Sequence, residues 1–245
     1  MERKTFLTSG LAALGFAAIA PFANSCKKES TTTTTSTTTT TGSSSSSGSC
    51  TATSSETAGP YPTITPSGYV RSNIVDGQSG VPLTIKLTFT NTNNSCAALT
   101  GALVDIWHCT ALGYYSEYTD TPGGGYATVN YTSSHFLRGR QVTDSAGLVT
   151  FTSIFPGWYS PRAPHIHVHV YNAAGTSLLI TQVAFPTDVC NTVYTTAADY
   201  KARGVQDTAN TADMVFSDSL ANELSTVTGS VSAGYVLTIG IGVAA

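Results

Sequence analysis

A short segment near residue 160 gathers side chains that together could do metal chemistry. It contains Tyr159, Arg162, His165 and His167. Imidazole nitrogens are common metal ligands, and a phenol becomes a ligand when a nearby cation displaces its proton. Arg stays charged and can stabilise negative charge that develops during a reaction. These residue types in one place indicate a metal-dependent site, although a strand with solvated histidines would show the same local pattern.

The histidines of this segment alternate with apolar residues. His165, His167 and His169 fall on one face of an extended chain, and the intervening Ile and Val residues fall on the other. This period of two predicts a half-buried strand over residues 165–171. Two His at positions i and i+2 project side by side, so both can reach one ion. Three imidazoles on one strand leave a zinc or copper protein as an alternative.

The rest of the chain predicts an all-β domain that positions this strand. Alternating or continuous apolar runs predict further strands over residues 83–89, 102–107, 147–154, 178–185 and 235–243. Short strands separated by turn signals are typical of a β-sandwich, so we expect a β-sandwich with long loops that carry the metal site. Residues 186–225 are less regular and predict loops with a short helix around residues 197–203.

Composition narrows the classes of partner. The 245 residues have a formal net charge of −3, and only 10% of them are charged. A nucleic-acid partner would require a basic patch, so we expect none. The length suits one all-β domain with appendages.

The N-terminal region predicts an export signal followed by a tether. Residues 1–26 combine a short basic region, an apolar run too short to span a membrane, and Cys26 after small residues. Cys26 resembles the lipidated Cys of a bacterial lipoprotein. Residues 27–49 are mostly Thr, Ser and Gly and predict a flexible tether. We expect a folded domain over residues 50–245, lipid-anchored at a bacterial cell envelope or, alternatively, secreted after plain cleavage.

The remaining cysteines suggest disulfides. With Cys26 assigned to lipid, four of the five cysteines are left, namely Cys50, Cys96, Cys109 and Cys190. An even number in an oxidising compartment predicts two disulfides, whose pairing the sequence leaves open.

Several motifs across residues 50–245 resemble those of the intradiol ring-cleavage dioxygenases. They are ETAGPY (56–61), VRSNI (70–74), GVPL (80–83), VDIWHCTALGYYS (104–116), FLRG (136–139), TDSAG (143–147) and the segment 155–170. The resemblance implies a non-haem Fe(III) enzyme that cleaves the ring of a catechol-type substrate with O₂ to a cis,cis-muconate-type product.

The resemblance also implies roles for individual residues. The ferric ligands would be Tyr115, Tyr159, His165 and His167. Arg162 matches the family's catalytic Arg, and Gln182 matches a Gln next to the ligands. Two phenolates suit a hard ferric ion, whereas non-haem Fe(II) oxygenases use two His and a carboxylate. A secreted β-sandwich that binds or adheres, without iron, is the alternative of another class.

Overall fold

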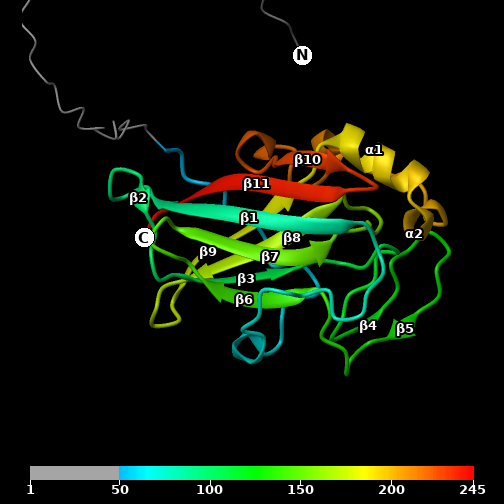
Figure 1. Cartoon of the computed structure of the whole chain (residues 1–245), viewed down its shortest axis with the longest axis horizontal. Helices are drawn as coiled ribbons and strands as arrows, with labels where there is room; N and C mark the ends of the chain where they lie inside the picture. The colour runs from blue at the N-terminus through cyan, green and yellow to red at the C-terminus, as the bar shows by residue number, and fades with distance from the viewer. Residues whose placement is uncertain (1–49) are drawn as a thin grey trace, which may run out of the picture. The chain divides into compact units, whose positions relative to one another are not determined.

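The computed structural model describes residues 50–245, which form two packed β-sheets and a small two-stranded sheet, with short helices beside them (Figure 1). The strands are β1 (Pro82–Asn91), β2 (Ala97–Ala98), β3 (Leu103–Trp107), β4 (Thr119–Asp120), β5 (Val129–Asn130), β6 (Arg138–Val142), β7 (Leu148–Ile154), β8 (His165–Tyr171), β9 (Ser177–Ala184), β10 (Thr226–Ser230) and β11 (Gly234–Val243). The helices are α1 (Thr187–Thr196) and α2 (Ala198–Lys201), with 3₁₀ turns η1 (Pro66–Gly68), η2 (Asn210–Ala212) and η3 (Leu220–Asn222).

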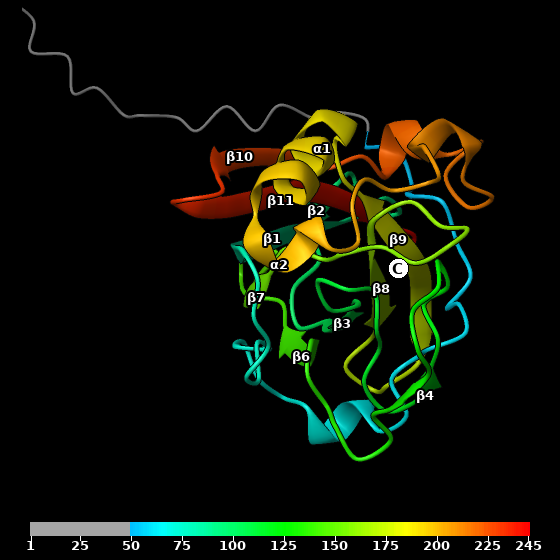
Figure 2. The ribbon, with the colours of Figure 1, turned by 90° about the vertical axis from the view of Figure 1, so that its right-hand side faces the viewer.

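The first sheet has the strand order β10-β11-β1-β2, and β7 also pairs with β1. Its two longest strands, β1 and β11, run parallel, and its other pairs are antiparallel. The second sheet has the order β6-β3-β8-β9 and is antiparallel throughout. Figure 2 separates the two layers, with β10 and β11 on one side and β8 and β9 on the other. The prediction of an all-β sandwich is confirmed.

The core lies between the two sheets. Leu83, Ile85 and Phe89 of β1 alternate with outward-facing residues and are buried, as their sequence pattern predicts. From the second sheet, Val168 and its apolar neighbours on β8 pack into the same cluster. Burying these side chains against a second sheet is the main favourable term for this fold.

The other face of β8 is buried too. His165 and His167 are 3% and 0% exposed, because loops and residues 57–61 cover this side of the second sheet. His169 is only partly buried. The alternative interpretation, a strand with solvated histidines, is therefore wrong for His165 and His167.

The six predicted strands all appear, but other elements differ from expectation. The sequence reading missed β6, whose residues Arg-Gly-Arg-Gln-Val show no apolar alternation. The short helix predicted around residues 197–203 is α2 (Ala198–Lys201), whereas α1, which begins at Thr187, was not expected. α1 lies beside the hairpin of β10 and β11 and buries Val193 and Tyr194 in the core.

The prediction of two disulfides is wrong. Cys50 and Cys96 form a disulfide, whereas Cys109 and Cys190 are buried free thiols. Cys109 packs in a small cluster with Trp107 and two tyrosines, while Cys190 belongs to the main core. Burial raises the pKa of both thiols, that of Cys109 to about 12, so neither readily forms the thiolate that disulfide formation requires.

The predicted export signal, Cys26 and the tether lie outside the described residues. Within residues 50–245, no helix is long and apolar enough to cross a bilayer.

Candidate metal centre

Four residues in register form a row across the second sheet. Arg138 of β6 pairs with Trp107 of β3, Trp107 pairs with His167 of β8, and His167 pairs with Gln182 of β9. Paired residues on neighbouring strands point to the same face, so this row presents four large polar or aromatic side chains away from the core. Two of them, His167 and Gln182, were predicted site residues.

The two predicted histidine ligands meet at their Nε2 atoms. The Nδ1–H of His165 donates to the carbonyl of Ala163 across 2.6 Å, which leaves the Nε2 lone pair free. That Nε2 lies 3.1 Å from Nε2 of His167. Burial, with Arg162 adding to it, lowers the pKa of His165 to about 3, and burial also holds the pKa of His167 well below its usual value. Both imidazoles are therefore neutral, as metal ligands must be.

The two tyrosines reach the histidines from separate loops. Oη of Tyr115, in the loop after β3, lies 3.4 Å from Nε2 of His165. The ring of Tyr159, in the loop before β8, has its centroid 5.7 Å from that of Tyr115 and 5.5 Å from that of His165. Burial raises the pKa of Tyr115 well above its usual value and that of Tyr159 to about 12, with Arg162 opposing the rise at Tyr159. Both phenols keep their protons unless a cation replaces them.

Close backbone packing fixes these two loops against each other. Gly157 N–H donates to the carbonyl of Thr110 across 3.0 Å. A Cβ at Gly113 would lie 2.3 Å from the carbonyl oxygen of Trp158, and Gly113 has a φ of +95°. Only glycine fits such an approach, so the loop that carries Tyr115 and the loop that carries Tyr159 come together as one unit.

Arg162 lies beside the ligands and is held by a carboxylate. Its Nε donates to Oδ2 of Asp213 across 2.9 Å, and its Nη2 donates to Oε1 of Gln182 across 2.7 Å. The guanidinium also lies over the ring of Phe216, 5.7 Å from its centroid. Sequence reasoning missed Asp213, because it stands in the irregular stretch after β9 with no periodic pattern around it.

Residues 57–64, which we call the covering strap, cross over the row. Nε2 of Gln182 donates to the carbonyl of Thr57 across 2.9 Å. A Cβ at Gly59 would lie 2.9 Å from Cε1 of His167, so the strap touches that ring directly. Further along, the ring of Tyr61 stacks on Tyr115 with centroids 4.6 Å apart and an interplanar angle of 22°. The strap therefore covers two of the four predicted ligands.

Trp107 stacks on the ring of His167, one of the predicted ligands. Its indole is parallel to the imidazole of His167, with centroids 4.8 Å apart and an interplanar angle of 1°. Nothing in the sequence singled out this contact, since a buried Trp is expected in any core.

His169 does not join the site. Its ring nitrogens interact with Tyr171 Oη at 2.7 Å and Ser177 Oγ at 2.8 Å. Among residues 50–245, no cluster of three or more His, Cys, Asp or Glu side chains could hold a metal. His169 therefore stands apart from His165 and His167, which argues against the three-imidazole alternative.

The donor set fits ferric iron. Tyr115 Oη and His167 Nε2 both lie within 3.4 Å of His165 Nε2, and the ring of Tyr159 borders them. Among residues 50–245, no carboxylate joins the two imidazoles. Phenolates are hard, anionic ligands that suit a highly charged cation. The buried Nδ1 of His167 has no hydrogen-bond partner among the described residues. Because His165 carries its proton on Nδ1, its Nε2 accepts from His167 Nε2–H at 3.1 Å when no cation is bound. A move of that proton to the unpartnered His167 Nδ1 would leave both Nε2 lone pairs available to a cation.

Comparisons with known proteins identify the family that this chain resembles. The family model described as Dioxygenase matches residues 60–219. A stretch of 115 residues is 30% identical to chlorocatechol 1,2-dioxygenase from Rhodococcus opacus, and it spans 39% of this chain and 41% of that relative. The match thus covers less than half of that curated relative's length.

Solved structures extend the likeness to the whole described domain. An intradiol ring-cleavage dioxygenase from Tetranychus urticae superposes with a TM-score of 0.69 at 27% identity, over 79% of this chain and 95% of that one. The dioxygenase domain of a carbohydrate-binding fusion protein from Streptomyces sp. SirexAA-E superposes with a TM-score of 0.54 at 25% identity, over 78% and 97%. Because the family match covers more than half of the chain, the protein belongs to the intradiol ring-cleavage dioxygenase family.

Proposed function

We propose that this dioxygenase holds Fe(III) with Tyr115, Tyr159, His165 and His167 and opens the ring of a catechol-type substrate. Both atoms of O₂ would enter a cis,cis-muconate-type product, so the reaction needs no external reductant. The observation that carries the proposal is the convergence of two phenols and two neutral imidazoles in a buried site. Bound Fe(III) would accept electron density from the chelated substrate and so make its ring reactive toward O₂.

The chain's own residues can manage the substrate's protons. A catechol must lose its hydroxyl protons to chelate a metal. Tyr159, held as a phenolate by the proposed metal, could take one of these protons at its Oη on leaving the metal. Burial raises the pKa of the free phenol to about 12 and so favours the protonated form. It is also the more accessible of the two phenols, with Tyr159 8% exposed and Tyr115 0% exposed.

Arg162 would stabilise negative charge on the deprotonated substrate. Its guanidinium lies close enough to Tyr159 to oppose the rise of that phenol's pKa. Nε and one Nη2 proton are used by Asp213 and Gln182, which orients the remaining donors of the planar fork. A fixed, buried donor of this kind stabilises developing charge without reorganising during the reaction.

Oxygen uptake by purified protein tests the proposal. The substrates should include catechol, a further hydroxylated catechol and a carboxylated one, with products identified by mass. We expect about one iron per chain, the number for a single four-ligand site, together with a visible tyrosinate band and ring-opened dicarboxylates. A colourless, iron-free protein without oxygen uptake would overturn the proposal and favour a binding or adhesion module.

We also propose, from the sequence alone, that the enzyme is exported and lipid-anchored through Cys26. Fractionation of cells that express Cys26→Ala is the test. We expect the variant to leave the membrane fraction, and equal membrane association of variant and wild type would exclude lipidation.

A further inference from the structure

We propose that Arg138 is a positioning residue that sets the place of the Tyr115 phenol by holding the two chain segments that enclose it. The proposal rests on the proposed function in that Tyr115 is taken as a metal ligand. Arg138 itself does not touch the predicted ligands, and its side chain is fully buried.

One side of the guanidinium holds the residue that follows the ligand. Nε of Arg138 donates to Ser116 Oγ across 2.9 Å, and Nη2 donates to the Ser116 carbonyl across 2.7 Å. Ser116 Oγ in turn donates to the carbonyl of Phe136 across 2.7 Å. The backbone directly after Tyr115 is thereby tied to the segment that leads into β6.

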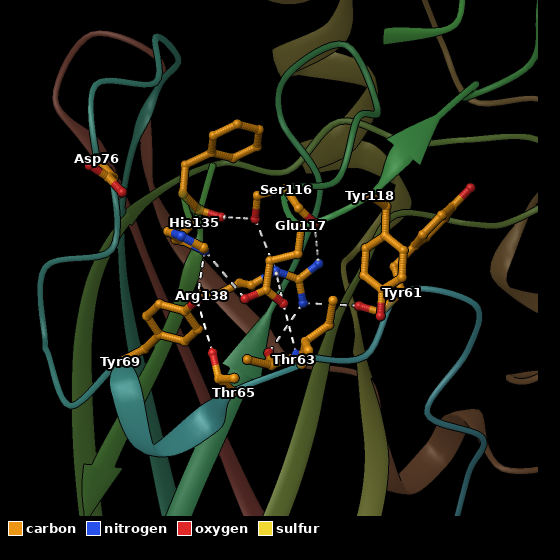
Figure 3. A network of polar contacts seen from close by, with 12 residues as sticks. Tyr61, Thr63, Thr65, Tyr69, Asp76, Ser116, Glu117, Tyr118, His135 and Arg138 are labelled. Atoms are coloured by element: carbon orange, nitrogen blue, oxygen red, sulfur yellow. Dashed lines mark hydrogen bonds and ion pairs between the residues drawn. The ribbon is translucent and has the colours of Figure 1, made fainter. Parts of the chain in front are cut away.

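The other side holds the covering strap. Nη1 of Arg138 donates to the Tyr61 carbonyl across 2.9 Å and to Thr63 Oγ1 across 3.1 Å. Tyr61 is the residue whose ring stacks on Tyr115. One guanidinium therefore fixes both the backbone of the ligand and the ring that lies against it (Figure 3).

Glu117 completes the clamp. Its Oε2 lies 3.4 Å from Nε of Arg138 and accepts the backbone N–H of Ile64 across 2.8 Å. The ion pair thus joins the same two segments a second time, the loop after Tyr115 and the end of the strap. Figure 3 shows the carboxylate beside the guanidinium in this network. A buried charge with a counter-ion and four acceptors is well satisfied, and loss of either partner is costly.

The position of Arg138 in the sheet explains why it can do this. Arg138 stands at one end of the row across the second sheet, and Gln182 stands at the other end. Gln182 binds the strap at Thr57 and Arg138 binds it at Tyr61, while Gly59 lies against His167 between them. The strap is fastened at both ends of the row that carries a ligand. A Lys at position 138 could keep the charge, but its three donors cannot reproduce a planar fork that spans two segments.

The test compares Arg138→Lys with Arg140→Lys. Arg140 stands two positions along the same strand and pairs with the buried carboxylate of Asp105 at 2.5 and 2.7 Å, but it contacts no residue of the site. We expect similar losses of melting temperature in both variants. Only Arg138→Lys should shift the tyrosine near-ultraviolet circular dichroism towards that of Tyr115→Phe. Any change in Arg140→Lys should come from Tyr171, over whose ring Arg140 lies, and should not resemble Tyr115→Phe. Arg138→Lys, but not Arg140→Lys, should also bind iron more weakly. In a chelator competition we expect its affinity to fall by about 10- to 100-fold, as for other groups that orient metal ligands.

Each outcome decides the matter. If Arg138→Lys matches Arg140→Lys in both dichroism and iron retention, Arg138 is merely structural and the proposal is overturned. If Arg138→Lys does not fold, Thr63→Val takes its place, since it removes one hydrogen-bond acceptor of Arg138 from the half-exposed strap. An altered tyrosine dichroism spectrum of Thr63→Val supports the proposal, and a wild-type spectrum overturns it. If wild-type protein binds no iron, the proposed function fails, and the dichroism comparison still decides the role of Arg138.

Discussion

Asp213 fixes Arg162 and the backbone before the histidine strand with the same carboxylate. Its Oδ2 accepts from Nε of Arg162 at 2.9 Å and from the backbone N–H of Ala163 at 2.6 Å. Its Oδ1 accepts the backbone N–H of Val215 at 2.8 Å. Although burial favours the protonated form, the hydrogen bond from Arg162 and these two backbone N–H groups lower the pKa of Asp213. The orientation of Arg162 is thus built into the segment that leads to His165.

Replacing Arg162 by Ala should separate charge stabilisation from metal binding. We expect turnover to fall by about 10²–10³, as when a preorganised donor is removed, while iron and colour remain. The melting temperature should also fall, because Asp213 loses its counter-ion, although two backbone N–H groups still satisfy it. Turnover, iron content and thermal unfolding are the measurements. Near-normal turnover with full iron would contradict the role, and loss of iron together with activity would make Arg162 a structural residue.

Replacing Tyr115 by Phe should remove a metal ligand. Tyr114→Phe is the matched control, because the Tyr114 hydroxyl donates to the carbonyl of Ala127 at 2.9 Å and not to the site. We expect Tyr115→Phe to bleach or shift the visible band and to lower iron content, whereas the control keeps both. The measurements are the absorption spectrum and iron per chain. A fully coloured, iron-replete Tyr115→Phe protein would exclude this ligand.

Gly59→Ala should disturb the His167 ring. The new Cβ would lie 2.9 Å from His167 Cε1, and Gly59 has a φ of +70°. Gly77→Ala is the control, because Gly77 has a φ of +78° but no atom within 4 Å of the new Cβ. Both variants should lose about 1–2 kcal/mol of stability from the left-handed backbone. Only Gly59→Ala should also weaken iron binding, by about 10- to 100-fold in a chelator competition. Equal iron binding in the two variants would refute the contact.

The free energy of unfolding should depend on pH through Glu223, whose carboxyl accepts a hydrogen bond from Thr181 of β9. Burial, with Glu56 adding to it, raises its pKa from 4.5 to about 7, while hydrogen bonds from Ser219 and Thr181 oppose the rise. Between these two values the folded state keeps a proton that the unfolded state releases. The free energy of unfolding should therefore fall as pH rises through this window, by at most about 1.4 kcal/mol per pH unit, and level off above it.

The variant Glu223→Gln tests this assignment. It keeps the shape of the neutral acid and removes the titration, and the partner hydroxyls can accept as well as donate. Denaturant unfolding from pH 4.5 to 8 should show a flatter profile and a more stable variant above pH 7. A variant with the same slope as wild type would assign the effect to other groups.

The sequence predicts the strands of this fold well where one face meets the core. On β1 and β8 the apolar side chains alternate, so period and burial agree. The strand β6 could not be predicted in this way. Its residues Arg138 and Arg140 contact carboxylates and covering segments and not the core, so the strand shows no apolar alternation. The polar sequence of β6 is typical of a loop, and only the structure reveals the ion partners that bury it.

The site was predictable in its ligand set and in Arg162 and Gln182, but not in the residues that hold them. Tyr115, Tyr159, His165 and His167 could be named because their motifs resemble those of a family, and the structure brings them together. The metal assignment itself stays a prediction. The residues that hold them, such as Asp213, act through contacts that close only in three dimensions, so no local spacing reveals them.

The row from Arg138 through Trp107 and His167 to Gln182 also has a consequence for the order of assembly. Its members come from four strands, and the strap that closes over it comes from still earlier in the chain. Bringing such distant positions together carries the entropy of closing several long loops, which is recovered only when the whole sheet forms. Under the proposed iron assignment, the four ligands come together only when the second sheet and its loops have formed. The appearance of a tyrosinate colour during refolding would then time the completion of that sheet.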